Sequence, residues 1–84
     1  MAEVVKNIKG FKVLKVGVDE IINIGGLGIC DSCGKTSEIG YYVAVLNMWF
    51  CPTCYNEWML RATYYKEDKK IEDRNYENMR NLLE

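Results

Sequence analysis

The two short stretches that decide the fold read Cys30-Asp31-Ser32-Cys33-Gly34 and Cys51-Pro52-Thr53-Cys54. Two residues separate the cysteines of each pair and seventeen separate the pairs, which gives the pattern C-x2-C-x17-C-x2-C. Thiolates two residues apart contact one metal ion when the chain turns tightly, and two such pairs complete a tetrahedron. Gly34 suits such a turn because glycine adopts positive φ. The spacing is typical of four-thiolate zinc sites. It predicts one structural Zn²⁺, with the ligands Cys30, Cys33, Cys51 and Cys54.

Three other uses of four cysteines stay open at this point. Disulfides are one, but the start of the chain lacks the apolar stretch of a signal peptide, and we therefore expect a reducing, cytoplasmic location. A redox dithiol needs only one C-x-x-C pair, and iron–sulfur clusters usually take four cysteines at other spacings. Four protein ligands leave no open position for water or substrate, so we expect a structural rather than a catalytic metal.

Composition narrows the class of protein. The chain has 84 residues, 49% of them hydrophobic, which is enough for one small domain (residues 1–84) and argues against disorder. Eleven Lys and Arg balance twelve Asp and Glu, and there is no His. The near-zero net charge disfavours a protein that coats nucleic acid or an acidic membrane. The absence of His excludes Cys/His zinc sites and His-based catalysis.

The segment between the cysteine pairs predicts a β-hairpin. Residues 41–46 form a β-rich run, Asn47 suits a turn because it tolerates positive φ, and Trp49 and Phe50 return as a second strand. Pro52 then suits the first position of a helix, where its missing N–H is not needed. Apolar residues follow with helical spacing on one face: Tyr55, Trp58, Met59, Ala62 and Tyr65.

The N-terminal third predicts one strand, followed by a segment that could be a helical turn or an irregular strand. Residues 1–9 are mixed polar and predict a frayed end, whereas residues 11–18 are rich in β-branched residues and predict a strand. Asp19 could then cap a short helical turn over residues 20–24. An irregular strand that continues to Ile29 is an equally good interpretation.

The C-terminal part predicts a second helix after a charged break. Residues 66–74 interrupt the apolar periodicity, and a helix is expected over about 72–83. Its apolar side would carry Tyr76, Met79, Leu82 and Leu83. Acidic residues interleave here with Lys and Arg, which predicts a solvated segment with salt bridges. These acidic residues are Asp68, Glu72, Asp73 and Glu77.

The order of cysteine pair, hairpin, cysteine pair and amphipathic helix resembles a treble-clef zinc finger, with the cysteine spacing of GATA-type fingers. The resemblance covers residues 28–66 as a zinc-finger core and leaves 67–84 as a C-terminal helical extension. It implies a small zinc-stapled α+β domain. GATA-type fingers are strongly basic, whereas the only charged residues in the segment 34–50 of this chain are Lys35 and Glu38. Only the four cysteines therefore carry over, as metal ligands. The hairpin motif VLN-x-W also resembles small uncharacterised bacterial and phage zinc-finger proteins, which implies no activity.

These observations predict a non-enzymatic, zinc-stabilised interaction module that binds a protein partner, with no small-molecule substrate and no membrane. No nucleophile–base pair, P-loop or dinucleotide turn is present. The alternative is a small DNA- or RNA-binding regulator. It would use an N-terminal lysine arm, whose members are Lys6, Lys9, Lys12 and Lys15. Trp58 is expected in the core, while Trp49 could equally be buried or form part of a binding surface.

Overall fold

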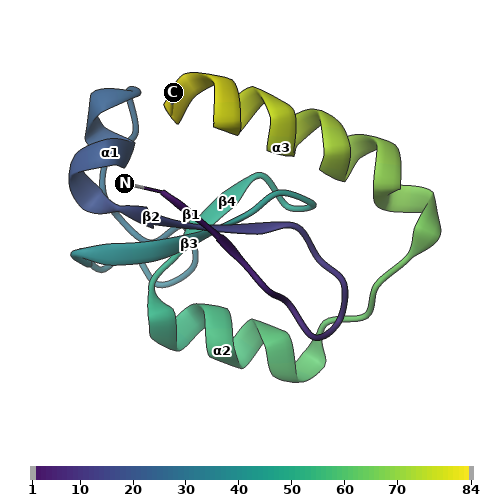
Figure 1. The fold of residues 1–84 in the computed structure, drawn as a ribbon. Helices are drawn as coiled ribbons and strands as arrows, with labels where there is room; N and C mark the ends of the chain where they lie inside the picture. Colours follow the sequence, from purple (N-terminus) through teal and green to yellow (C-terminus); the bar gives the residue numbers. More distant parts are fainter. Residues whose placement is uncertain (1, 84) are drawn as a thin grey trace.

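A computed structural model describes residues 2–83 and shows a small α+β fold, which confirms the predicted fold class (Figure 1). Its elements in chain order are β1 (Glu3–Val5), β2 (Val13–Gly17), α1 (Val18–Asn23), β3 (Ile39–Val43), β4 (Met48–Phe50), α2 (Pro52–Arg61), the 3₁₀ turn η1 (Lys66–Asp68) and α3 (Lys69–Leu83). The four strands form one antiparallel sheet in the order β1-β2-β3-β4. No helix within residues 2–83 is long and apolar enough to cross a membrane.

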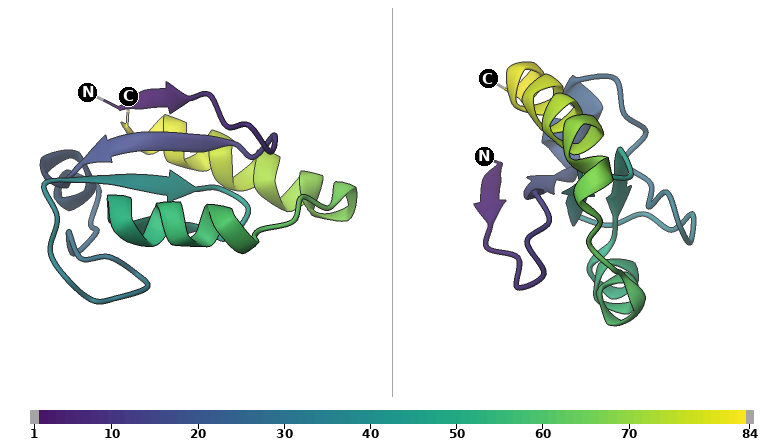
Figure 2. Two further views of the ribbon diagram at one scale, coloured as in Figure 1. Left: turned by 90° about the horizontal axis from the view of Figure 1, so that it is seen from below. Right: turned by 90° about the vertical axis from the view of Figure 1, so that its right-hand side faces the viewer.

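Helices cover both faces of this sheet. Figure 2 shows α2 on one face and α3 on the other, with α1 beside the end of α3. Because side chains alternate along a strand, neighbouring residues enter different cores: Tyr42 faces α3 and Val43 faces α2. Trp49 is only 4% exposed, because the hairpin face that could have met solvent lies under α3. It is therefore a core residue and not an exposed stacking platform.

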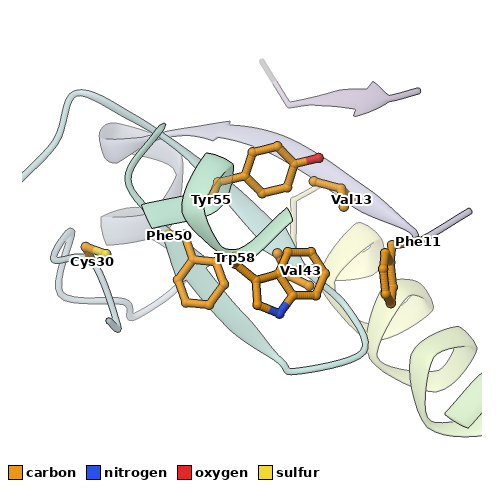
Figure 3. Close-up of a cluster of buried hydrophobic side chains, with 7 residues drawn as sticks. All are labelled: Phe11, Val13, Cys30, Val43, Phe50, Tyr55 and Trp58. Carbon is orange, nitrogen blue, oxygen red and sulfur yellow. The ribbon is translucent and has the colours of Figure 1, made fainter. Parts of the chain in front are cut away.

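The α2-face core is built around aromatic rings that contact one another (Figure 3). Trp58 lies with its ring centroid 4.7 Å from Phe11 and 6.2 Å from Phe50. Cys30 belongs to the same cluster and is 2% exposed. The predicted burial of Trp58 is confirmed, and one cysteine of the motif is continuous with this core.

Strand β1 lies within the segment that was expected to fray, so that expectation is wrong for residues 2–9, and Met1 lies outside the described residues. Strand β1 pairs with β2, with Glu3 opposite Lys15. The sequence of β1 alone gives no sign of this partner. The ambiguous segment is helix α1, and its cap is Gly17 rather than Asp19, which lies inside the first turn. The Glu20 carboxylate accepts the N–H of Gly17 at 3.5 Å and supports this helix start.

The predicted hairpin is confirmed with shorter strands. Strand β3 ends at Val43, because the chain already turns there: the N–H of Leu46 donates to the Val43 carbonyl at 3.2 Å. Asn47 has φ 54°, as expected for the turn. Helix α2 begins at Pro52 as predicted but ends at Arg61. Tyr65 therefore lies beyond the helix and is 56% exposed, in contrast to the predicted apolar face.

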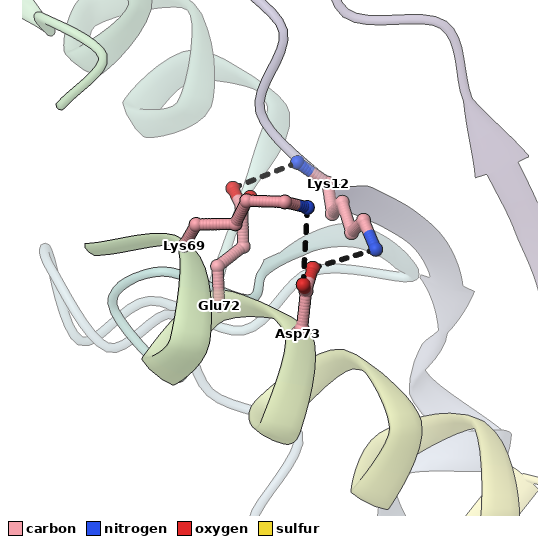
Figure 4. A network of polar contacts seen from close by, with 4 residues as sticks. All are labelled: Lys12, Lys69, Glu72 and Asp73. Carbon is pink, nitrogen blue, oxygen red and sulfur yellow. Dashed lines mark hydrogen bonds and ion pairs between the residues drawn. The ribbon is translucent and has the colours of Figure 1, made fainter. Parts of the chain in front are cut away.

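Helix α3 begins at Lys69, earlier than predicted, and its acidic residues are not all solvated. Glu72 is 1% exposed, and its carboxylate accepts the N–H of Lys12 at 3.0 Å (Figure 4). Asp73 lies 2.7 Å from the Lys12 ammonium and 3.1 Å from that of Lys69. These cations hold the pKa of Asp73 below its usual range. The charged segment thus docks α3 onto Lys12, directly before β2, and the burial of Glu72 contradicts the expectation of a wholly solvated segment.

The apolar side of α3 is largely as predicted. Tyr76 is buried, and Met79 and Leu83 pack against the same cluster as Trp49. Leu82 differs, because 57% of it is exposed.

Replacing Trp58 by alanine should lower the free energy of unfolding by about 3 kcal/mol or more, since it removes a large buried side chain. Glu57→Ala is the matched control, because Glu57 is next to Trp58 in α2 but is exposed. This substitution should change stability little. Urea unfolding followed by circular dichroism measures both. Equal destabilisation by the two variants would show that the buried face of α2 is assigned incorrectly.

Gly40→Ala should also destabilise the fold, for a steric reason. A Cβ at Gly40 would overlap the indole ring of Trp49, and that ring is held by a 3.2 Å hydrogen bond from its N–H to the Val16 carbonyl. Overpacking of this kind costs about 1–3 kcal/mol. In Gly17→Ala the new Cβ meets only ordinary contacts, the nearest at 3.7 Å. A thermal melt in which Gly40→Ala is as stable as the unmodified chain would contradict this packing.

Candidate metal centre

The first cysteine pair lies in a tight turn between α1 and β3. The Lys35 carbonyl accepts the N–H of Cys30 at 2.9 Å, and the Cys30 carbonyl accepts the N–H of Gly34, also at 2.9 Å. Gly34 has φ 75°, which a residue with a Cβ adopts only with strain. The turn predicted from the spacing is therefore present, and glycine is used there for its backbone conformation.

The second pair lies at the start of helix α2. Cys51 is the N-cap residue, and Cys54 is in the first turn. Pro52 opens the helix directly after Cys51, so the chain passes from β4 into α2 without a loop. Residues three apart at a helix start lie on the same side, and both sulfur atoms therefore face the first cysteine pair.

Asp31 holds the two pairs against each other, and the sequence interpretation did not single it out. Its backbone N–H donates to the Trp49 carbonyl at 2.9 Å, and its carboxylate accepts the Trp49 N–H at 2.8 Å. Trp49 is two residues before Cys51, so these two bonds fix the first turn beside the second pair. The sequence shows an acidic residue between two cysteines, but it does not show that the hydrogen-bond partner of this residue, Trp49, is eighteen positions away.

The sulfur atoms of all four cysteines lie close together. The Sγ atoms of the four cysteines lie within 4.8 Å of one another, and those of Cys33 and Cys51 are 3.8 Å apart. A tetrahedral zinc site with bonds of about 2.3 Å has sulfur–sulfur edges of about 3.8 Å. The four cysteines are thus positioned to hold a metal ion. Four sulfur donors suit the Zn²⁺ ion that the sequence predicts.

Hydrogen bonds and burial act in opposite directions on the thiols. Burial disfavours the charged form of Cys30, but backbone N–H groups directed at its sulfur outweigh burial and lower the pKa of Cys30 to about 6. Two of these donors are the N–H groups of Cys33 and Ser32, at 3.5 and 3.4 Å. Burial, together with hydrogen bonds to the neighbouring thiols, raises the pKa of Cys54 to about 12. Hydrogen bonding therefore favours the thiolate at Cys30, whereas burial and the neighbouring thiols favour the neutral thiol at Cys54.

Comparisons with protein-family models, with curated proteins and with solved structures find no match to this chain. The fold and the site therefore define its class: a small α+β domain with a four-cysteine cluster suited to a metal ion.

Purified protein should carry one zinc ion per chain, and Cys51→Ser should lose the metal and unfold. Zinc binding in small domains is worth on the order of 10 kcal/mol, comparable to the whole stability of a domain. Ser32→Ala is the control, since Ser32 lies in the same turn and offers no sulfur. Elemental analysis and circular dichroism under reducing conditions measure both properties. A metal-free native protein, or a folded Cys51→Ser variant, would disprove the assignment.

Proposed function

We propose that this chain is a zinc-stabilised interaction module of treble-clef type that binds a protein partner and catalyses no reaction. The observation that carries the proposal is the convergence of all four sulfur atoms within 4.8 Å. Thiolate sulfur is a preferred ligand of zinc, and four protein ligands complete its tetrahedron. The ion would join the turn after α1 to the start of α2, and it would have no position for a substrate.

The arrangement of elements supports the treble-clef assignment. A turn carries the first cysteine pair, the hairpin β3–β4 follows, and the second pair opens helix α2. In this chain the hairpin is also the edge of a larger sheet, since β2 pairs with β3. A further helix, α3, covers the face opposite α2 (Figure 1).

The contacts that the lysine arm makes within the chain support a protein partner over nucleic acid. Lys12 forms its ion pair with Asp73, and the Lys9 ammonium donates to the Ala62 carbonyl at 2.6 Å, at the end of α2. Lys15 lies opposite Glu3 in the β1–β2 pair. Two of the four lysines of the arm, Lys9 and Lys12, are therefore bound to the chain's own acceptor and acid, whereas nucleic-acid binding rests on concentrated positive charge.

Exposed apolar side chains also support a protein partner. Leu27 is 83% exposed and Leu82 is 57% exposed. Both line the same hollow in the surface, and clustered apolar surface marks binding sites for proteins more often than for nucleic acid. Affinity capture from the source cells, followed by titration with the purified partner, would test the proposal directly.

Duplex DNA and single-stranded RNA should bind no tighter than the non-specific range of about 10⁻⁴ to 10⁻⁶ M at physiological salt. The chain has a net charge of −1 from its ordinary side chains, and a zinc tetrathiolate would bring it to about −3. Fluorescence anisotropy at several salt concentrations measures the affinity. Nanomolar, sequence-dependent binding would overturn the proposal. Loss of such binding when the four lysines of the arm are changed to Glu would then establish the nucleic-acid alternative.

A further inference from the structure

An apolar groove lies beside the cysteine turn, on the α3 face of the sheet. Its volume is about 450 Å³. Tyr42 and Trp49 line it from the sheet, Leu27 from the linker after α1, and Met79 and Leu82 from the C-terminal half of α3. The exposed leucines noted above are therefore not scattered, because they line one groove.

The walls of this groove are held by close packing. The linker approaches α1 at two glycines: a Cβ at Gly26 would overlap Ile21, and a Cβ at Gly28 would overlap Val18. On the sheet side, the indole of Trp49 is fixed by its hydrogen bond to Val16. A preformed groove loses little conformational entropy when a partner binds.

The edge strand next to the groove excludes one kind of occupant. Partners that add a strand to a sheet need free backbone N–H and C=O groups at its edge. In β4, the outward N–H and C=O of Trp49 are both bonded to Asp31. An occupant at this position therefore binds by inserting side chains, as an amphipathic helix does with apolar residues spaced i, i+3, i+4 and i+7.

The charge at the groove indicates the rest of the occupant's chemistry. Asp31 is the one charged residue among the described residues that line the groove. It lies between Cys30 and Cys33, whose site would keep a net charge of about −2 with four thiolates and a divalent ion. No lysine or arginine from the described lining offsets this charge. Electrostatic complementarity therefore favours a positively charged partner.

We infer that this groove binds a basic amphipathic helix of the partner protein, with apolar side chains inserted beside Trp49 and a Lys or Arg directed at Asp31. The inference rests on the proposed function, since it names the class of partner and the docking site of that module. Leu27 and Leu82 would be the contacts most open to substitution, because both are exposed and their loss leaves the core intact.

The probe is a fluorescein-labelled helical peptide of about 18 residues, with leucines at i, i+3, i+4 and i+7 and lysines on its polar face. We expect saturable binding at micromolar concentration by anisotropy. Leu27→Asp and Leu82→Asp should each weaken binding about tenfold or more, which corresponds to about 1.4 kcal/mol. Leu60→Asp is the matched control, because Leu60 is 87% exposed on α2, across the sheet from the groove. Circular dichroism and metal content verify that each variant is folded.

Two further comparisons test the charge. A peptide with Glu in place of Lys should bind at least tenfold more weakly. Asp31→Asn should remove part of this preference, while the amide oxygen can still accept the Trp49 N–H. Equal binding of the Lys and Glu peptides would overturn the basic partner. A scrambled Leu/Lys peptide that binds as well as the patterned one would overturn the helical partner.

The remaining outcomes separate this inference from the proposed function. Absence of peptide binding, or equal weakening by Leu60→Asp, overturns the groove as a docking site, and binding of only a small apolar dye assigns it to a small ligand instead. If a captured partner binds Leu27→Asp and Leu82→Asp as tightly as the unmodified chain, the inference fails while the interaction module stands. Nanomolar nucleic-acid binding without a protein partner defeats both.

Discussion

The reciprocal hydrogen bonds between Asp31 and Trp49 connect the parts of this molecule on which the proposed function rests. They attach the first cysteine turn to strand β4, two residues before the second pair begins at Cys51. They also occupy the outward backbone groups of β4, so the sheet ends there without a free edge at that residue. The carboxylate that makes one of these bonds is the charged residue lining the apolar groove. One short side chain thus contacts the cysteine cluster's turn, the sheet edge and the groove.

The second constraint is size. A chain of 84 residues has little surface to bury, and this one divides its core between two faces of a sheet. Helix α3 is held to the sheet by a polar contact as well as by packing: Glu72 accepts the backbone N–H of Lys12, which leads into β2 (Figure 4). On the other face Cys30 is part of the aromatic cluster (Figure 3). A metal ion held by Cys30 would therefore stabilise the α2-face core directly.

The metal centre and the groove have separate roles in the proposed function. A site with four protein ligands organises the chain but offers a partner nothing to bind, so recognition must come from the surface that it organises. That surface is apolar beside an acidic centre, and the lysines of the N-terminal segment are directed elsewhere: Lys9 to the end of α2 and Lys12 to Asp73. This distribution of charge is the reason that we propose a protein partner rather than nucleic acid.

Local chemistry made much of the fold and the cysteine cluster predictable. The spacing of the cysteines, Pro52 at the helix start and Asn47 in the turn each express a short-range rule of backbone geometry, and the structure follows them. Features that depend on distant partners were not predictable. Strand β1 forms by pairing with β2. Glu72 is buried because its carboxylate meets a backbone N–H sixty positions away, and Trp49 is covered because α3 returns over the sheet. The sequence by itself determined the turns, the helix start and the four cysteines that could hold a metal ion, since each depends on the spacing of nearby residues. Tertiary structure alone decided which charges are buried, which aromatics are covered and where the groove lies, since those depend on which distant segments meet.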